Sequence, residues 1–338
     1  MNNRLLVTLL GITSLILMLV ALPFLSSCTA QPAEAVVLEW VSFEPETQST
    51  IQNVKRGFID RVNEMGGGDF VLQYRGGPET IAAFDQGKAV QSGVIDMAIT
   101  PVGFYESLAP GINAIKLSRI TVDEERKSGG GYDYVDELHN AAGLKWIGRA
   151  TMTEEGFFYV ALREQKLETR EDFQGFAMGG GTGGRAAALG WGSDYTDVVM
   201  PDFYASMERG LVDGLAVIAL SSQVAQGVHE VTDYYIDHKF YQSTAGIYMN
   251  LDTWNGLPKN MQEILIEAIT LSEKDQIVWF NETDAALRQK AMDGGVEFYK
   301  LAPDVAEWYL ATAYDAAWAY QMDKFPDETP GLKALISK

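Results

Sequence analysis

The chain is poor in the residues that most catalytic and metal sites need. It has one cysteine, Cys28, and three histidines, His139, His229 and His238. A single cysteine forms no disulfide within the chain, and it leaves no thiolate for catalysis or metal binding in the domain that follows it. The histidines lie in no H-E-x-x-H or similar spacing, and no G-x-S-x-G motif is present. We therefore expect no metal, no cofactor and no histidine-centred catalytic triad.

Basic residues are also scarce. The chain has 26 Lys and Arg against 46 Asp and Glu, which gives a net charge of −20. Removal of the first 27 residues takes away one charge, that of Arg4, so the net charge becomes −21. Proteins that bind nucleic acid or adhere to anionic bilayers usually carry basic patches. The composition therefore argues against both partners.

The N-terminus has the pattern of an export signal. Arg4 precedes an apolar run from Leu5 to Leu25, and Leu25-Ser26-Ser27-Cys28 resembles the bacterial lipobox, in which the cysteine is lipidated. We expect residues 1–27 to be a signal peptide, Cys28 the lipid attachment site and residues 28–35 a tether to the membrane. The alternative is an uncleaved membrane anchor, because a run of this length just spans a bilayer. Both predict an extracytoplasmic domain.

The first half of the remaining chain alternates strands and helices. Residues 36–43 are rich in β-formers, apolar residues recur at helical spacing from Ile51 to Val62, and residues 70–75 and 94–100 resemble further strands. This β-α-β-α-β order predicts a largely parallel sheet covered on both faces. Ligands of such sheets bind at the carboxyl ends of the strands, here residues 42–43, 76–79 (with Glu79) and 100–101.

A second strand–helix series runs from about Leu144 to Met249, with no Pro/Ser-rich linker before it. We therefore predict an α/β fold with two lobes of mixed and parallel sheets, between which the chain crosses several times. Lobe I comprises residues 36–145 with part of 245–275, and lobe II comprises residues 146–244 with part of 276–338.

Residues 259–293 contain neither glycine nor proline and consist of helix formers. An unbroken helix of this length is about 50 Å long, at about 1.5 Å per residue, which is enough to join two lobes. The alternative is two helices that break near Ser272.

The glycine run Gly179–Gly184 satisfies the pattern G-x-G-x-x-G, between a short apolar run and a helix-like segment. Such glycines let backbone amides approach a pyrophosphate, so a nucleotide-dependent oxidoreductase is one hypothesis. A glycine-rich turn before a helix also suits any small anion, which would place Gly181 and Thr182 at a binding site.

Five segments of the chain form an ordered set of motifs. They are Gly93–Ala98 (G-x-x-D-M-A), Gly143–Gly148, Thr169–Gly175 (similar to T-x-x-D-L-K-G), Phe203–Gly214 (similar to Y-x-A-L-x-x-G-x-V-D-G) and Trp254–Pro258 (W-x-x-L-P). In this order they resemble the solute-binding proteins of TRAP transporters, the DctP type, and Phe203–Gly214 is the most specific of them. The resemblance covers nearly the whole chain after the signal.

This resemblance implies two lobes that close on a small solute, a partner pair of TRAP membrane subunits, and a ligand that is usually a small organic acid held by arginine. The chain departs from that pattern at three places. The family's arginine position after the K-G entry is Gly179, the second-lobe strand reads Gly156-Phe157-Phe158-Tyr159, and Val217 stands where an asparagine is frequent. A buried carboxylate needs a charge-assisted partner, so another donor must replace them.

Arg185, six residues beyond Gly179, is the first candidate and Arg149 the second; a solvent-facing arginine is the alternative for Arg185. If neither points inward, the ligand is neutral, aromatic or cationic, and apolar side chains line its site. Candidates for that lining are Phe158, Trp191, Tyr248, Trp40 and Val217, with Asn250 as a polar contact and Glu154 and Glu155 as partners of a cation.

The sequence therefore favours an extracytoplasmic solute-binding lipoprotein over an enzyme. Two alternatives stay open at this point: the nucleotide-dependent oxidoreductase, and a sensor or scaffold derived from the binding fold.

Overall fold

The computed structural model describes residues 35–337 except Thr244, and it leaves out the side chains of Val217 and Ile218. Cys28 and the predicted signal and tether lie outside the described residues, apart from Ala35. Within the described chain, no helix combines the length and the apolar character needed to cross a membrane.

The first sheet, which defines lobe I, has the strand order β2-β1-β3-β10-β4. Its strands are β1 (Val36–Ser42), β2 (Phe70–Gly76), β3 (Met97–Pro101), β10 (Ala245–Asn250) and β4 (Leu144–Arg149). Strand β1 pairs in parallel with β2 and β3, as the sequence predicts. Strand β10 returns from the other lobe and lies antiparallel between β3 and β4, so the sheet is mixed.

The predicted helix after β1 forms, but it is interrupted by a π-helical turn. It consists of α2 (Ser49–Val54), the π-helix η1 (Lys55–Ile59) and α3 (Asp60–Met65), and it buries Ile51, Val54, Phe58 and Val62. Gly57 lies in the π-helical turn where η1 packs on α11, and a Cβ there would stand 2.8 Å from Ser272 Oγ. The lack of a side chain at Gly57 therefore permits this close approach.

Short helices cover the rest of lobe I. They are α4 (Gln86–Gln91), η2 (Val102–Phe104), η3 (Ile112–Leu117), α5 (Val122–Glu125), α6 (Gly131–Ala141) and α10 (Leu251–Gly256). Thr121 caps α5 with a capping box, in which its side chain and that of Glu124 bond reciprocally to backbone amides.

The second sheet, which defines lobe II, has the order β11-β9-β5-β8-β6-β7. Its strands are β5 (Phe158–Leu162), β6 (Ala177–Gly180), β7 (Asp194–Asp197), β8 (Gly214–Ala219), β9 (Tyr234–Phe240) and β11 (Glu297–Tyr299). The helical segments of this lobe are η4 (Glu171–Phe173), α7 (Thr182–Gly190), η5 (Met200–Asp202), α8 (Phe203–Glu208), α9 (Leu220–Ala225) and η6 (Val228–Val231). Both sheets are mixed, which confirms the predicted fold class.

The chain passes from the first sheet to the second between Arg149 and Phe158, and it returns between Phe240 and Ala245. These crossing segments are hydrogen-bonded to each other at both ends. Ala150 N–H donates to Ala245 O at 2.7 Å, and Phe157 N–H donates to Tyr241 O at 2.7 Å. The lobes are therefore joined by a short two-stranded neck.

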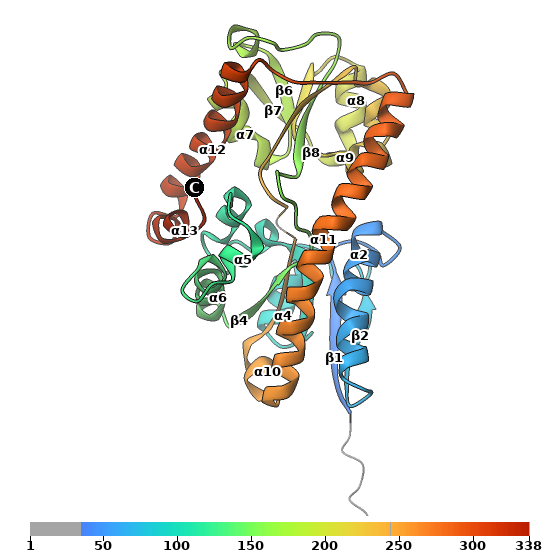
Figure 1. Ribbon diagram of the computed structural model, residues 1–338, viewed down its shortest axis with the longest axis vertical. Coiled ribbons are helices and arrows are strands. Elements are labelled where there is room, and N and C mark those ends of the chain that lie inside the picture. Colours follow the sequence, from blue (N-terminus) through green and yellow to red (C-terminus); the bar gives the residue numbers. More distant parts are fainter. Residues whose placement is uncertain (1–34, 244, 338) are drawn as a thin grey trace, which may run out of the picture. The chain divides into compact units, whose positions relative to one another are not determined.

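Helix α11 (Lys259–Asp293) is a third connection, and it is continuous (Figure 1). It packs against β4 and η1 in lobe I and against α9 in lobe II. The prediction of one long helix is thus confirmed, and Ser272, where a break was the alternative, lies buried within it. The chain ends with α12 (Pro303–Lys324), which packs on α7, and α13 (Thr329–Ile336), which packs on α6 and η3.

Candidate functional site

A cavity of about 630 Å³ lies between the lobes. Lobe I contributes η2, η3 and the segment before α4, while lobe II contributes the first turns of α7 and helix α12. We call it the interlobe cavity. Its lining includes Phe84, Phe104, Glu106, Asn113, Lys116, Thr182, Gly183, Arg185, Leu189, Tyr320, Gln321 and Lys324.

The glycine run places the start of α7 at this cavity. A Cβ on Gly180 or on Gly184 would stand 2.8 Å from Ala216 O, so both glycines allow α7 and β6 to pack closely on β8. Thr182 and Gly183 then line the cavity, while Gly181 is exposed and its carbonyl accepts a hydrogen bond from Tyr195 Oη at 2.6 Å. The packing of the strand–helix junction accounts for these glycines without a nucleotide.

Arg185 lines the cavity, as the sequence predicts for a ligand contact, but it already has partners. Its guanidinium forms an ion pair with Asp197 and lies over the Tyr195 ring at 5.3 Å. Its side chain is 42% exposed, so this pair is well solvated. Whether Arg185 holds a ligand stays a prediction.

Lys116, near the end of η3, lies at the wall of the interlobe cavity. It is partly buried, and its ammonium stands 5.5 Å from the centre of the Tyr241 ring. Burial lowers the pKa of Lys116 to about 8; the nearby Glu106 carboxylate raises this pKa and Lys324 lowers it further. No sequence motif marks this lysine, because only the fold brings it to the cavity.

An apolar wall faces α7 and α12. Phe84 and Phe104 stack with ring centroids 4.1 Å apart, and Phe84 is 68% exposed. On the other side of the cavity, Leu189 and Tyr320 are each 52% exposed. Exposed apolar side chains that gather at one place usually mark a binding surface.

Four of the predicted site residues lie in the interior and do not line the interlobe cavity. Trp40 is 1% exposed and packs against Tyr74 in the core of lobe I. Trp191 donates to Tyr309 O and stacks on that ring, and the Tyr248 hydroxyl bonds to Thr100 Oγ1 at 2.8 Å. Asn250 caps α10, since its side chain accepts from Thr253 N–H, and it also donates to Val90 O. Each therefore has a structural role.

The remaining residues that the sequence predicts for the site lie at several separate places in the structure. Phe158 begins β5 and contacts Phe157 edge-to-face, and neither lines the interlobe cavity. Glu79 accepts the N–H of Gly77 at 2.6 Å within its own turn, and this bond lowers the pKa of its carboxyl. Val217 lies in β8, but its side chain is outside the described residues. Glu154 and Glu155 are exposed residues of the neck.

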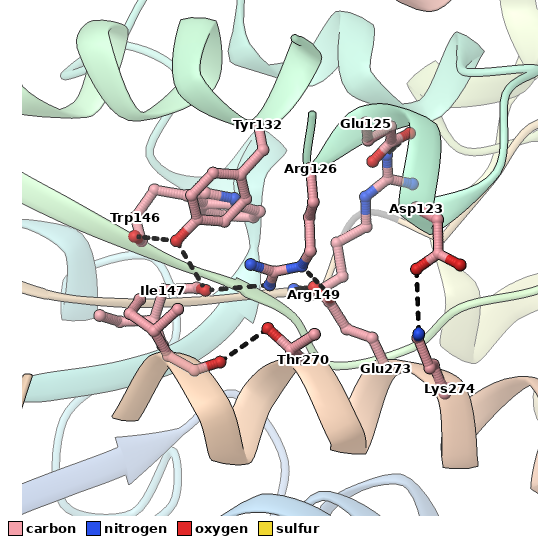
Figure 2. A network of polar contacts seen from close by, with 11 residues as sticks. Asp123, Glu125, Arg126, Tyr132, Trp146, Ile147, Arg149, Thr270, Glu273 and Lys274 are labelled. Carbon is pink, nitrogen blue, oxygen red and sulfur yellow. Dashed lines mark hydrogen bonds and ion pairs between the residues drawn. The ribbon is translucent and has the colours of Figure 1, made fainter. Parts of the chain in front are cut away.

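Arg149 belongs to a different site, a network of buried charges beside the neck (Figure 2). Its guanidinium forms an ion pair with Glu125, and its backbone N–H donates to Glu273 Oε1 at 2.8 Å. Glu273 of α11 also pairs with Arg126. Burial raises the pKa of Glu125, and Arg149 and the Ser118 hydroxyl oppose that rise. The network ties α5 and β4 to α11. Arg149 also lines a separate cavity of about 410 Å³, which shares no lining residue with the interlobe cavity.

Within the described chain, no group of three or more histidine, cysteine, aspartate or glutamate residues is placed to hold a metal ion. The lining of the interlobe cavity presents cations, one carboxylate (Glu106), amides and aromatic rings to a ligand. These groups suit binding of a small organic molecule.

Comparison with known proteins agrees with this architecture. Residues 41–323 match the family model described as bacterial extracellular solute-binding protein, family 7, named DctP. The chain is 19% identical to a monocarboxylate 2-oxoacid-binding periplasmic protein of Nostoc sp. over 75% of this chain and 71% of the relative. It is 23% identical to a solute-binding protein of Chromohalobacter salexigens over 75% of each chain.

Solved structures share the fold. A TRAP periplasmic solute-binding protein from Ochrobactrum anthropi has a TM-score of 0.76 at 17% identity, covering 90% of this chain and 95% of its own. One from Sulfitobacter sp., solved with β-D-galacturonate, has a TM-score of 0.69 at 19% identity and covers 89% of this chain and 100% of its own. The family match spans most of the chain, and the chain therefore belongs to the DctP family of bacterial extracellular solute-binding proteins.

Proposed function

We propose that this chain is an extracytoplasmic receptor that captures a small organic solute in the interlobe cavity and delivers it to the membrane subunits of a TRAP transporter. Membership of the DctP family implies a transport receptor rather than an enzyme. The observation that carries the proposal is the cavity itself, because both lobes line it and its volume of about 630 Å³ suits a small ligand.

Lobe closure is the expected mechanism. The neck, α11 and the C-terminal helices α12 and α13 connect the two lobes, so a small change of backbone angles in these segments would alter the separation of the cavity walls. A ligand that touches Lys116 on one wall and α7 on the other stabilises the form in which both contacts exist. The solute is thus held by differential contacts, and the closed form is the one that docks on the transporter.

The position in the cell follows from the N-terminal pattern. We propose that residues 1–27 are removed and that a lipid on Cys28 anchors the receptor to the membrane, through the tether of residues 28–35. The support is the apolar run and the Leu-Ser-Ser-Cys sequence. Mass spectrometry of the purified protein tests this, since cleavage and lipidation change the mass of the N-terminal peptide in opposite and calculable ways.

Three relatives whose names state a ligand bind small anions. One binds monocarboxylate 2-oxoacids, one was solved with galacturonate and one, from Desulfovibrio desulfuricans, with sn-glycerol 3-phosphate. We infer that this chain also takes a small anion, although the positions of the family's arginine and asparagine hold Gly179 and Val217.

Native mass spectrometry of the full chain, purified in mild detergent, is the direct test. We expect a small molecule that stays bound under gentle conditions and leaves on unfolding. Small-angle scattering before and after removal of that molecule should show a more compact protein when it is bound. A protein that carries no solute, binds none of a broad panel of organic acids and shows no change in compactness would contradict the proposal.

A further inference from the structure

The charges around the interlobe cavity are almost balanced within the chain. Three cations line it: Lys116, Arg185 and Lys324. Arg185 is paired with Asp197, and Lys324 Nζ lies 2.8 Å from Glu106 Oε2. Among the described residues, no carboxylate oxygen lies within 4 Å of Lys116 Nζ. One positive charge in this cavity therefore lacks a counter-charge.

The position of Lys116 makes that charge costly. Lys116 belongs to η3 and is partly buried, and its ammonium lies over the ring of Tyr241 in the neck. The charged groups that act on it are Glu106, beyond ion-pair distance, and Lys324, which repels it. An ammonium that has lost part of its water without gaining a carboxylate is destabilised. A ligand carboxylate would restore the missing partner through a charge-assisted hydrogen bond.

The rest of the lining restricts the chemistry of the ligand's body, which is the part of the ligand other than its carboxylate. Phe84 stacks on Phe104 and is mostly exposed, and Leu189 and Tyr320 face the cavity from lobe II. The uncharged polar side chains of the lining are few: Thr182, Asn113, the Tyr320 hydroxyl and Gln321, of which Gln321 is buried. A ligand rich in hydroxyl groups would leave most of them without partners against these rings, whereas an apolar or aromatic body gains by burial.

We propose that the interlobe cavity selects a monocarboxylate with an apolar, preferably aromatic, body, whose carboxylate is held by Lys116 and whose body lies on Phe84 and Phe104. The inference rests on the proposed function. A single unpaired cation matches a single negative charge. A second carboxylate would meet no unpaired cation and would be repelled by Glu106. In this proposal Lys116, in lobe I, replaces the family's arginine, whose position in lobe II is Gly179.

Isothermal titration calorimetry of the full chain at pH 7 with three probes tests separately the ligand's charge and the chemistry of the rest of the ligand. The probes are phenylacetate, its neutral isostere phenylacetamide, and succinate. We expect phenylacetate to bind most tightly and the other two to bind at least about tenfold more weakly, because a charge-assisted hydrogen bond is worth about one to two powers of ten in affinity. Succinate that binds more tightly than phenylacetate would overturn the inference.

Variants then assign the contact. Lys116→Met should weaken phenylacetate binding by about 10- to 100-fold and leave phenylacetamide binding unchanged, whereas Lys116→Arg should retain most of the affinity for phenylacetate. Lys259→Met, at a lysine that is 87% exposed on α11, is the matched control and should change neither. If Lys116→Met folds poorly, Lys116→Gln replaces it. Equal loss for both ligands, or no loss for phenylacetate, would contradict the role of Lys116.

The two proposals fail in different ways. If no apolar monocarboxylate binds but native mass spectrometry finds a solute of other chemistry, the receptor function stands and the ligand class is wrong. If the co-purified solute is itself an apolar monocarboxylate, both are supported. A chain that binds neither the probes nor any co-purified solute contradicts both.

Discussion

Two regions of this protein, the neck and the interlobe cavity, differ in how they treat buried cations. Beside the neck, Arg149 pairs with Glu125 and Arg126 pairs with Glu273, and all four side chains are at most 13% exposed. In the interlobe cavity, Lys116 is partly buried without an ion pair among the described residues. Each of these two arginines therefore has a carboxylate partner within the chain, whereas Lys116 in the cavity has none in the part of the chain that the structure describes.

This difference distinguishes cations that stabilise the fold from a cation that is available to bind a ligand. Desolvated ions inside a protein are tolerated when the chain supplies both partners, as it does between α5, β4 and α11. An ion left without a partner next to an open cavity destabilises the empty protein, unless something from outside completes it. Removal of a paired cation should therefore lower the stability of the ligand-free protein, and removal of the unpaired cation should raise it.

The largest effect is expected at the neck. Arg149→Met leaves the Glu125 carboxylate buried with the Ser118 hydroxyl as its remaining side-chain partner, which should cost about 3–5 kcal/mol of unfolding free energy. The double variant Arg149→Met with Glu125→Gln should regain part of that loss because no uncompensated charge remains. Urea denaturation followed by circular dichroism measures both. Lys259→Met, in an exposed pair with Glu263, serves as the control and should change stability by less than about 1 kcal/mol.

The opposite sign is expected in the cavity. Lys116→Met removes the unmatched charge, so the ligand-free protein should gain about 1–3 kcal/mol at pH 7. The pKa of Lys116 is lowered to about 8 in the folded protein because burial disfavours its charged form. The unfolded chain, with its higher lysine pKa, therefore binds more protons between pH 8 and the ordinary lysine range, and the penalty fades as the pH rises through that window.

The same urea experiment at several pH values checks this sign. The advantage of Lys116→Met over the unsubstituted protein should be full below pH 8 and small near pH 10.5. An advantage that is constant across this range would mean that packing, and not charge, causes it. A loss of stability below pH 8 would show that Lys116 has a partner within the chain.

A third prediction concerns binding and sharpens the role of the unpaired cation. If a carboxylate binds the protonated Lys116, binding takes up a proton above pH 8, and the apparent affinity for phenylacetate should fall by about tenfold for each further pH unit. Lys116→Arg should abolish this dependence because arginine stays charged. Titration calorimetry in two buffers of different ionisation enthalpy measures the proton uptake directly.

Periodicity and turn signals in the sequence predicted most of the fold. Alternating strands and helices gave the parallel pairing of β1 with β2 and β3, and the lack of glycine and proline gave the unbroken α11. The π-helical turn at η1 was not predicted; it lies where Gly57 approaches Ser272 closely, and Ser272 is more than 200 residues away along the chain. The return of β10 between β3 and β4 is likewise a long-range pairing that no local pattern records.

The site was harder to predict for the same reason. Residues chosen for chemical type, such as Trp40, Trp191 and Tyr248, are ones that a core also needs, and the structure places them in the interior. The glycine run did predict a turn followed by the start of a helix, which is α7, since a backbone turn is a local property; that Gly181 and Thr182 bind a ligand stays a prediction. Lys116 was not predicted, because a lysine is usually solvated and only the folded chain brings it to the cavity wall.

The smallest effect is expected at Arg185, the residue that spacing alone favoured as the anion's partner. Its pair with Asp197 is exposed, at 42% and 54%, so Arg185→Ala should cost less than about 1 kcal/mol of stability. Because Asp197 already neutralises this guanidinium, the affinity for phenylacetate should change by no more than about threefold, far less than in Lys116→Met. Calorimetry of the two variants side by side compares a paired with an unpaired cation in one cavity. A loss at Arg185 as large as that at Lys116 would show that the ligand displaces Asp197, and that pairing within the chain does not identify which cation binds.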